Sequence, residues 1–94
     1  MFIILLTYKK PLAEVEKNLE AHKTYLDKNY AAGNFIASGR QNPRVGGVIL
    51  CRANSKDDVM RIIGTDPFFA NDVADYQITE FIPSKYAKGF ENFI

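Results

Sequence analysis

The spacing of hydrophobic and polar residues in the first third of the chain predicts a strand followed by a helix. Residues 2–8 form a continuous apolar and β-forming run that stops at Lys9-Lys10-Pro11, which is typical of a strand buried on both faces. From Pro11 to about Ala32, apolar residues recur at helical spacing with charged residues between them, which predicts one long amphipathic helix. The predicted apolar stripe consists of Leu12, Val15, Leu19, Leu26 and Tyr30.

The middle of the chain predicts a hairpin and a second helix. Two short β-like runs, residues 35–38 and 48–51, flank a segment rich in turn-forming residues, as in two strands joined by a loop. Ser55 precedes carboxylates that suit the first turn of a helix, because they meet the positive end of its dipole. The apolar spacing that follows predicts a helix that ends at Gly64.

A short helical turn and a last strand complete the pattern. Asp66-Pro67 is typical of an N-cap followed by a proline in the first helical position, and residues 74–82 predict a strand that Pro83 ends. The order strand, helix, strand, strand, helix, strand predicts a ferredoxin-like α+β fold, with a four-stranded antiparallel sheet covered by helices on one face. We expect one domain over residues 1–94.

The predicted strands lack the alternation expected of a sheet with one face in water. Residues 2–6 and 48–51 are apolar at successive positions, so the face away from the helices needs an apolar cover. A second copy packed sheet to sheet is the simplest cover, and we therefore expect a homodimer. Aromatic and aliphatic residues of the C-terminal tail are candidates to wrap over an edge or the partner: Tyr86, Phe90, Phe93 and Ile94.

Composition excludes several classes of function. The formal net charge is +1 with both signs interspersed, so no electrostatic footprint for nucleic acid is present. The single cysteine, Cys51, excludes an internal disulfide and a cysteine-rich zinc site, and fits a reducing, cytoplasmic location. The apolar N-terminal run is too short for a signal peptide or a membrane span. One histidine and scattered carboxylates predict no metal site, and no motif predicts a cofactor.

His22 and Asp66 are the leading candidates for chemistry, although each also has a structural explanation. His22, the only histidine, falls on the apolar side of the predicted helix, where it is either a hydrogen-bonded core residue or a proton carrier. Asp66 is either a plain N-cap or the residue that orients the His22 ring and stabilises its protonated form.

The predicted hairpin carries candidate ligand-binding residues. Ser38 and Gly39 precede Arg40, and Arg44 lies in the loop, so backbone N–H groups and guanidinium groups are available to a carboxylate or phenolate. The alternative is a tight glycine-rich turn with two solvated arginines. The segment matches no phosphate-binding loop, and Ser38 lacks a nucleophile-elbow motif.

The ordered set of these motifs resembles the YciI-like (YCII-related) family over essentially the whole chain. The motifs are His22, Gly33, Ser38-Gly39, Asn42-Pro43-Arg44, Gly46-Gly47 and Asp66-Pro67-Phe68. The resemblance implies a dimeric ferredoxin-like fold related to the dimeric α/β barrels. It also implies a His–Asp site formed by His22 and Asp66 with Ser38 and Gly39 nearby. Arg40 stands where many relatives have proline.

Three functions are compatible with these features. The first is a cofactor-independent enzyme in which His22 and Asp66 perform acid–base chemistry, such as isomerisation, elimination or hydrolysis, on a small anionic or aromatic metabolite. The second is a dimeric module that binds a small molecule without turnover. The third is a structural subunit that pairs with another protein through its sheet. Fold and family alone do not identify a substrate.

Overall fold

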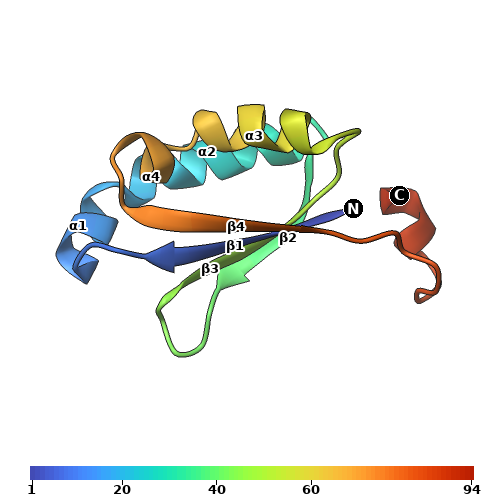
Figure 1. Ribbon diagram of the computed structural model, residues 1–94, viewed down its shortest axis with the longest axis horizontal. Helices are drawn as coiled ribbons and strands as arrows, with labels where there is room; N and C mark the ends of the chain where they lie inside the picture. The colour runs from blue at the N-terminus through green and yellow to red at the C-terminus, as the bar shows by residue number, and fades with distance from the viewer.

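A four-stranded antiparallel sheet in the order β2-β3-β1-β4 carries helices on one face (Figure 1). The computed structural model describes residues 1–94. The strands are β1 (Phe2–Tyr8), β2 (Phe35–Arg40), β3 (Gly46–Cys51) and β4 (Ala74–Glu80). The helices are α1 (Leu12–Lys17), α2 (Leu19–Ala31), α3 (Lys56–Gly64), α4 (Pro67–Ala70) and the 3₁₀ helix η1 (Phe90–Phe93). This is the predicted ferredoxin-like α+β arrangement.

Strand register divides the side chains of the sheet between two faces. Phe2, Ile4 and Leu6 of β1 point toward the helices and are buried, because α2, α3 and α4 cover them. Ile3 and Leu5 point the other way and are half-buried, which differs from the predicted strand buried on both faces. In the single chain, nothing covers that second face of the sheet, which we call the open face (Figure 1).

The predicted long helix is two helices, which meet at Asn18. The side-chain Nδ2 of Asn18 donates to Glu14 O at 2.9 Å, and its backbone N–H bonds to Val15 O at 3.1 Å instead. A side-chain hydrogen bond thus replaces the regular backbone one and ends α1. Asn71 Nδ2, at the end of α4, donates to Asn18 Oδ1 at 2.8 Å and fixes this junction.

The division into two helices also changes which residues are buried. Val15 is buried as predicted, but Leu12 and Tyr30 are exposed, and Leu19 and Leu26 are only half-buried. The buried side of α2 instead holds His22, Tyr25 and Asn29, at spacings of three and four residues. The helix therefore places polar groups and a titratable ring toward the core.

The ends of α3 and α4 follow the local signals in the sequence. Ser55 caps α3, because its Oγ accepts from Asp58 N at 3.2 Å. Asp66 caps α4 with Pro67 in the first helical position. Strand β4 ends at Glu80, two residues before the predicted end, although Phe81 N still bonds to Met1 O at 2.9 Å.

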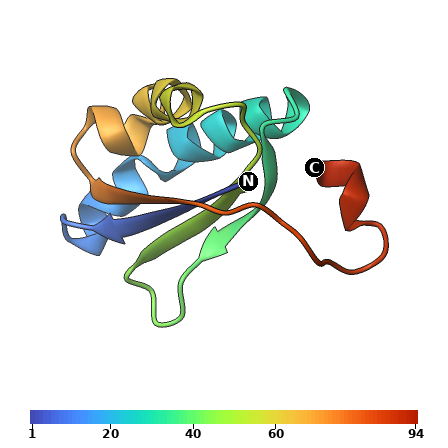
Figure 2. The same cartoon turned by 45° about the vertical axis from the view of Figure 1, so that its right-hand side comes forward.

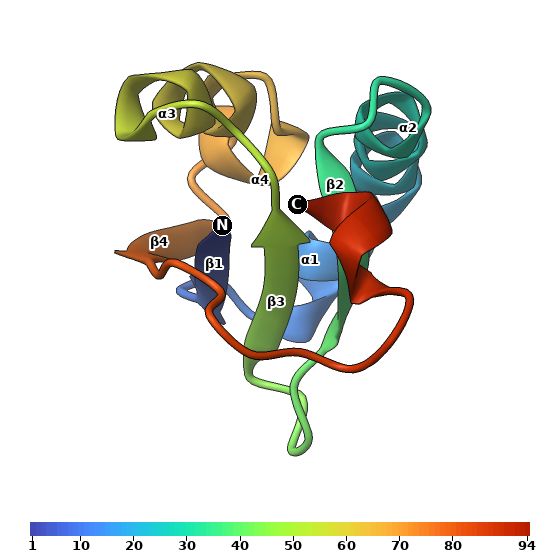
Figure 3. The same cartoon turned by 90° about the vertical axis from the view of Figure 1, so that its right-hand side faces the viewer.

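The tail after β4 leaves the sheet and returns toward α2. Figures 2 and 3 show it running away from β4 as an extended segment and ending in η1. Its aromatic rings contact one another, with centroids 6.0 Å apart for Tyr86 and Phe90 and for Phe90 and Phe93. In the single chain the tail leaves the open face uncovered. None of the helices has the length and apolar character needed to cross a membrane.

Candidate functional site

Asp66 is a fully buried carboxylate that accepts hydrogen bonds from three donors. Its Oδ1 accepts from Phe68 N at 2.9 Å and contacts His22 Nδ1 at 2.8 Å. Its Oδ2 accepts from the Tyr76 hydroxyl at 2.5 Å. A carboxylate has only acceptor sites, so the shared contact requires His22 to donate through Nδ1–H. The N-cap of α4 and the hydrogen-bond partner of His22 are therefore the same side chain.

The ring of His22 is held in one plane. It stacks on Phe68 with centroids 4.0 Å apart and an interplanar angle of 2°, and Tyr25 lies on a second side at 5.8 Å. The side chain is 11% exposed. With Nδ1 committed to Asp66, the other ring nitrogen, Nε2, has no partner within the chain. This arrangement fixes both the orientation of the ring and the nitrogen that a ligand can reach.

Two tyrosines lie close to the buried carboxylate, and their hydroxyls differ in bonding. Burial and the hydrogen bond to Asp66 raise the pKa of Tyr76 far above its ordinary value. Burial, with the nearby charge of Asp66, also raises the pKa of Tyr25. The Tyr25 hydroxyl has no hydrogen-bond partner, although it is buried. Tyr76 therefore stabilises the carboxylate, whereas Tyr25 contributes packing without a compensating hydrogen bond.

A cavity of about 220 Å³ opens beside His22 on the helix side of the sheet. Its walls are mostly apolar, and the polar groups in it come from α2 and from the β2–β3 hairpin. The lining residues that matter for chemistry are His22, Lys23, Ser38, Gly39 and Arg40, and the apolar ones include Leu6, Leu19, Leu26 and Phe68. The cavity is smaller than the 300–1,000 Å³ typical of drug-sized ligands, so it suits a single small ring.

The structure brings together all but one of the residues that the sequence singled out. Ser38, Gly39 and Arg40 line the cavity with His22, and Asp66 lies directly behind the ring. The Ser38 hydroxyl is bonded to Tyr30 OH at 2.6 Å. Arg44, expected to bind substrate, lies outside the cavity lining. Its guanidinium faces Glu16 at 3.6 Å, because the hairpin loop turns toward α1.

Tyr76 and Phe68, whose aromatic side chains are compatible with a pocket but by default are expected in the core, also lie at the site. Tyr76 reaches Asp66 because β4 pairs with β1 in a register that sets Tyr76 opposite Leu6, on the helix side of the sheet. Phe68 lies in α4 directly after the cap. The proximity of Phe68 to Asp66 was a usable signal, whereas the position of Tyr76 depends on a long-range strand pairing.

Burial and spacing decide whether the single cysteine and the carboxylates outside the pair form a reactive or metal-binding arrangement. The Cys51 thiol is fully buried, and burial raises its pKa to about 11, so it behaves as a small apolar side chain rather than a nucleophile. No three or more side chains of His, Cys, Asp or Glu lie together as metal ligands.

Fold and geometry define a ferredoxin-like α+β protein with a buried His–Asp pair at a small cavity. The sequence profile of the YCII-related domain matches residues 1–82, and the chain belongs to this family. The match confirms the resemblance drawn from the sequence motifs. A search of curated proteins finds no match.

Among solved structures, the chain is similar to 5-chloro-2-hydroxyhydroquinone dehydrochlorinase (TftG) from Burkholderia phenoliruptrix AC1100, in a complex with 2,5-dihydroxybenzoquinone. The TM-score is 0.73 at 19% sequence identity, with 87% of this chain and 94% of that chain covered. At this identity, the similarity establishes the fold. The neighbour is an enzyme that acts on an aromatic compound.

Proposed function

We propose that the protein is a cofactor-independent enzyme that moves protons on small hydroxylated aromatic compounds, with His22 as the proton acceptor and donor. The observation that carries the proposal is the contact of 2.8 Å between His22 Nδ1 and the fully buried Asp66 Oδ1, beside a cavity that His22 lines. A histidine that only filled the core would not need a buried carboxylate and an adjoining cavity.

The proposed proton transfer follows from the hydrogen bond between the His22 ring and Asp66. A ligand hydroxyl gives its proton to Nε2, the electron pair of the O–H bond stays on the ligand oxygen, and the ring becomes imidazolium. The Asp66 carboxylate stabilises that positive charge at the other nitrogen. Arg40, at the cavity, is available to the negative charge that develops on the ligand oxygen.

The substrate class is argued from the size and walls of the cavity and from the structural neighbour. A volume of about 220 Å³ with apolar walls and a ring of Phe68 fits one aromatic ring. Dehydrochlorination of a chlorohydroquinone suits such a site, since it needs only proton movement. Two hydroxyls lose protons, one proton returns to the carbon that carried chlorine, and chloride leaves with the electron pair of the C–Cl bond. The ring is oxidised as that carbon is reduced, so no outside oxidant is required.

The test is turnover of 5-chloro-2-hydroxyhydroquinone under anaerobic conditions, followed by chloride release and by quinone absorbance. We expect release by the wild-type protein and a loss of about 10²–10⁴ in kcat for His22→Gln. Lys85→Gln, an exposed change in the tail, is the control and should retain the wild-type rate. Binding of the compound without chloride or quinone would contradict the enzyme and favour a binding module.

We also propose that the protein acts as a homodimer through the open face. The half-buried residues Ile3, Leu5, Val48 and Leu50 on β1 and β3 support this, because they form an apolar strip with no cover in the single chain. Light scattering at low micromolar concentration should give twice the chain mass. Leu5→Glu should give monomers, whereas Met60→Glu, an exposed apolar position on α3, should not. A monomeric wild-type protein would refute the proposal.

A further inference from the structure

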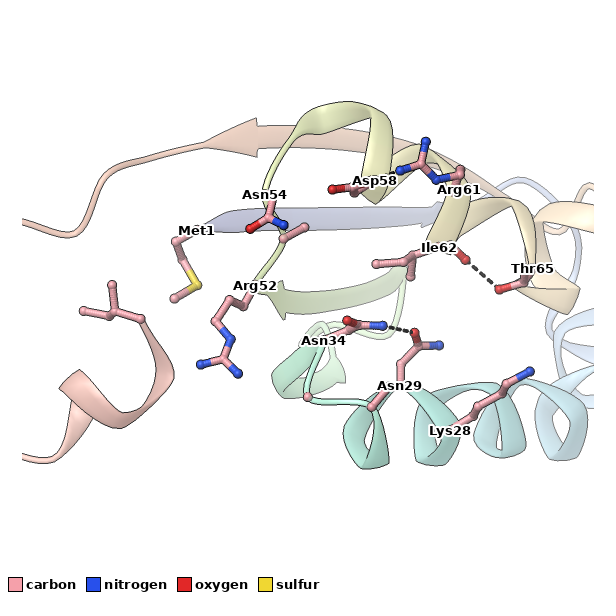
Figure 4. Close-up of a pocket in the computed structure, with 14 residues that line it drawn as sticks. Met1, Lys28, Asn29, Asn34, Arg52, Asn54, Asp58, Arg61, Ile62 and Thr65 are labelled. Carbon is pink, nitrogen blue, oxygen red and sulfur yellow. Dashed lines mark hydrogen bonds and ion pairs between the residues drawn. The ribbon is translucent and has the colours of Figure 1, made fainter.

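A second and larger cavity lies at the other end of the helical layer. It occupies the groove between α2 and α3, near the start of β1 and the end of β3, with a volume of about 900 Å³ (Figure 4). It shares no lining residue with the cavity at His22. Its size falls within the range of small-molecule sites, and it is independent of the His22–Asp66 pair.

The groove carries an excess of positive charge. Three basic side chains line it, Lys28, Arg52 and Arg61, against a single carboxylate, Asp58. Asp58 is already paired with Arg61 on α3. Neither Lys28 nor Arg52 has an ion-pair or hydrogen-bond partner for its side chain within the chain. Figure 4 shows the Arg52 side chain projecting from the end of β3 toward α2 and the tail helix. Lys28 points away from Arg52 in Figure 4, so Arg52 is the unpaired cationic group available to a ligand at this end of the groove.

Hydrogen bonds fix the backbone around Arg52 and the neighbouring turn after α2. Arg52 N donates to Asn34 O at 2.7 Å and ties the end of β3 to the turn after α2. Asn34 Nδ2 donates to Asn29 Oδ1 at 3.0 Å, and Asn29 Nδ2 donates to Tyr25 O at 2.9 Å. Gly33 adopts φ +80°, and a Cβ there would lie 3.5 Å from Arg52 Nη2, so the guanidinium rests over this turn. The base of the groove is preorganised rather than assembled on binding.

The other residues that line the groove are apolar or neutral, and they determine which uncharged part of a ligand can bind beside Arg52. Ala32, Ala53, Ile62 and Ile94 supply apolar surface on several sides of the groove. Asn54, whose side chain has no partner within the chain, adds a neutral donor and acceptor beside the start of α3. We propose that this groove is a second ligand site, which takes a small organic oxyanion, a carboxylate or a phosphate ester, with Arg52 holding the charged group and the apolar walls holding its body.

The experiment is a titration of the ¹⁵N-labelled full chain with phenyl phosphate, benzoate and inorganic phosphate, followed by ¹H–¹⁵N NMR. We expect phenyl phosphate or benzoate to shift the side-chain amides of Asn34 and Asn54 and the backbone around Arg52. Whichever of the two binds more tightly identifies the preferred charged group. Inorganic phosphate should bind at least tenfold more weakly, because it has no apolar body. Equal binding of inorganic phosphate would overturn the assignment of an organic ligand.

Variants separate a binding role of the basic residues from a structural one. Arg52→Gln should weaken the tighter ligand by about tenfold or more, as expected for loss of a charge-assisted contact. Lys56→Gln, which removes an exposed charge from the first turn of α3 outside the groove, should change affinity less than threefold. Unchanged affinity in Arg52→Gln would show that Arg52 only complements the carbonyl end of α2. Shifts confined to residues around His22 would also overturn the second site.

Discussion

The two tyrosines near Asp66 give opposite predictions for the same substitution to phenylalanine. Tyr76→Phe removes the hydroxyl that donates to Asp66 Oδ2 at 2.5 Å, whereas Tyr25→Phe removes a buried hydroxyl that has no partner. Hydrogen bonds to charged groups contribute about 1.5–3 kcal/mol, so we expect Tyr76→Phe to lower the free energy of unfolding by about 2 kcal/mol. A buried unsatisfied hydroxyl costs about 1–3 kcal/mol, so Tyr25→Phe should raise it by about 1 kcal/mol.

The assay is urea denaturation of both variants and the wild-type protein, monitored by circular dichroism. For a domain of this size, each 1 kcal/mol corresponds to about 4–8 °C in Tm, so thermal unfolding gives an independent check. Tyr8→Phe is a matched control, because the Tyr8 side chain contacts Phe68 edge-on at 6.2 Å and its hydroxyl makes no hydrogen bond within the chain. If Tyr25→Phe and Tyr76→Phe destabilise the protein equally, the reasoning about the two hydroxyls is wrong.

Three further predictions concern stability. Because the pKa values of Tyr25 and Tyr76 are raised in the folded state, folding holds their protons more tightly, and the free energy of unfolding falls as the pH rises above the ordinary tyrosine pKa of about 10. Urea midpoints at pH 8 and pH 11 should therefore differ less in the double Phe variant, and an unchanged difference would contradict this. Gly46→Ala should abolish folding in circular dichroism, because a Cβ there would overlap the backbone of β1, whereas Gly39→Ala meets open space and should fold normally. Ser55→Ala should cost about 1 kcal/mol in urea denaturation through loss of the α3 cap, and no loss would show that the cap is not stabilising.

The order of elements was predictable from local signals, because each signal acts within a few residues of the feature that it determines. Ser55 and Asp66 cap their helices, and Pro67 begins α4, where the sequence places them. The junction at Asn18 was not predictable in the same way. It depends on a side-chain hydrogen bond that competes with the backbone, and on Asn71 from a distant part of the chain. Helical periodicity carries no information about either contact.

The candidate site was predictable only in part, for a related reason. His22 could be assigned to the buried side of its helix from spacing, but its contact with Asp66 required the packing of α2 against α4. Tyr76 joins them through the register of β4 on β1, and a shift of one residue would point it to the open face. Arg44 was assigned to the cavity because it shares a loop with Arg40, yet the path of that loop directs it to Glu16.

The most direct test of the central claim is the tautomer of His22, measured from its ring ¹⁵N chemical shifts at a pH where the imidazole is neutral. His22 is the only histidine, so the signals need no assignment strategy. The account predicts a proton on Nδ1, bonded to Asp66, and an unprotonated Nε2 that shifts when a small phenol is added. A proton on Nε2, or an Nε2 signal that phenols leave unchanged, would contradict a catalytic role for the pair.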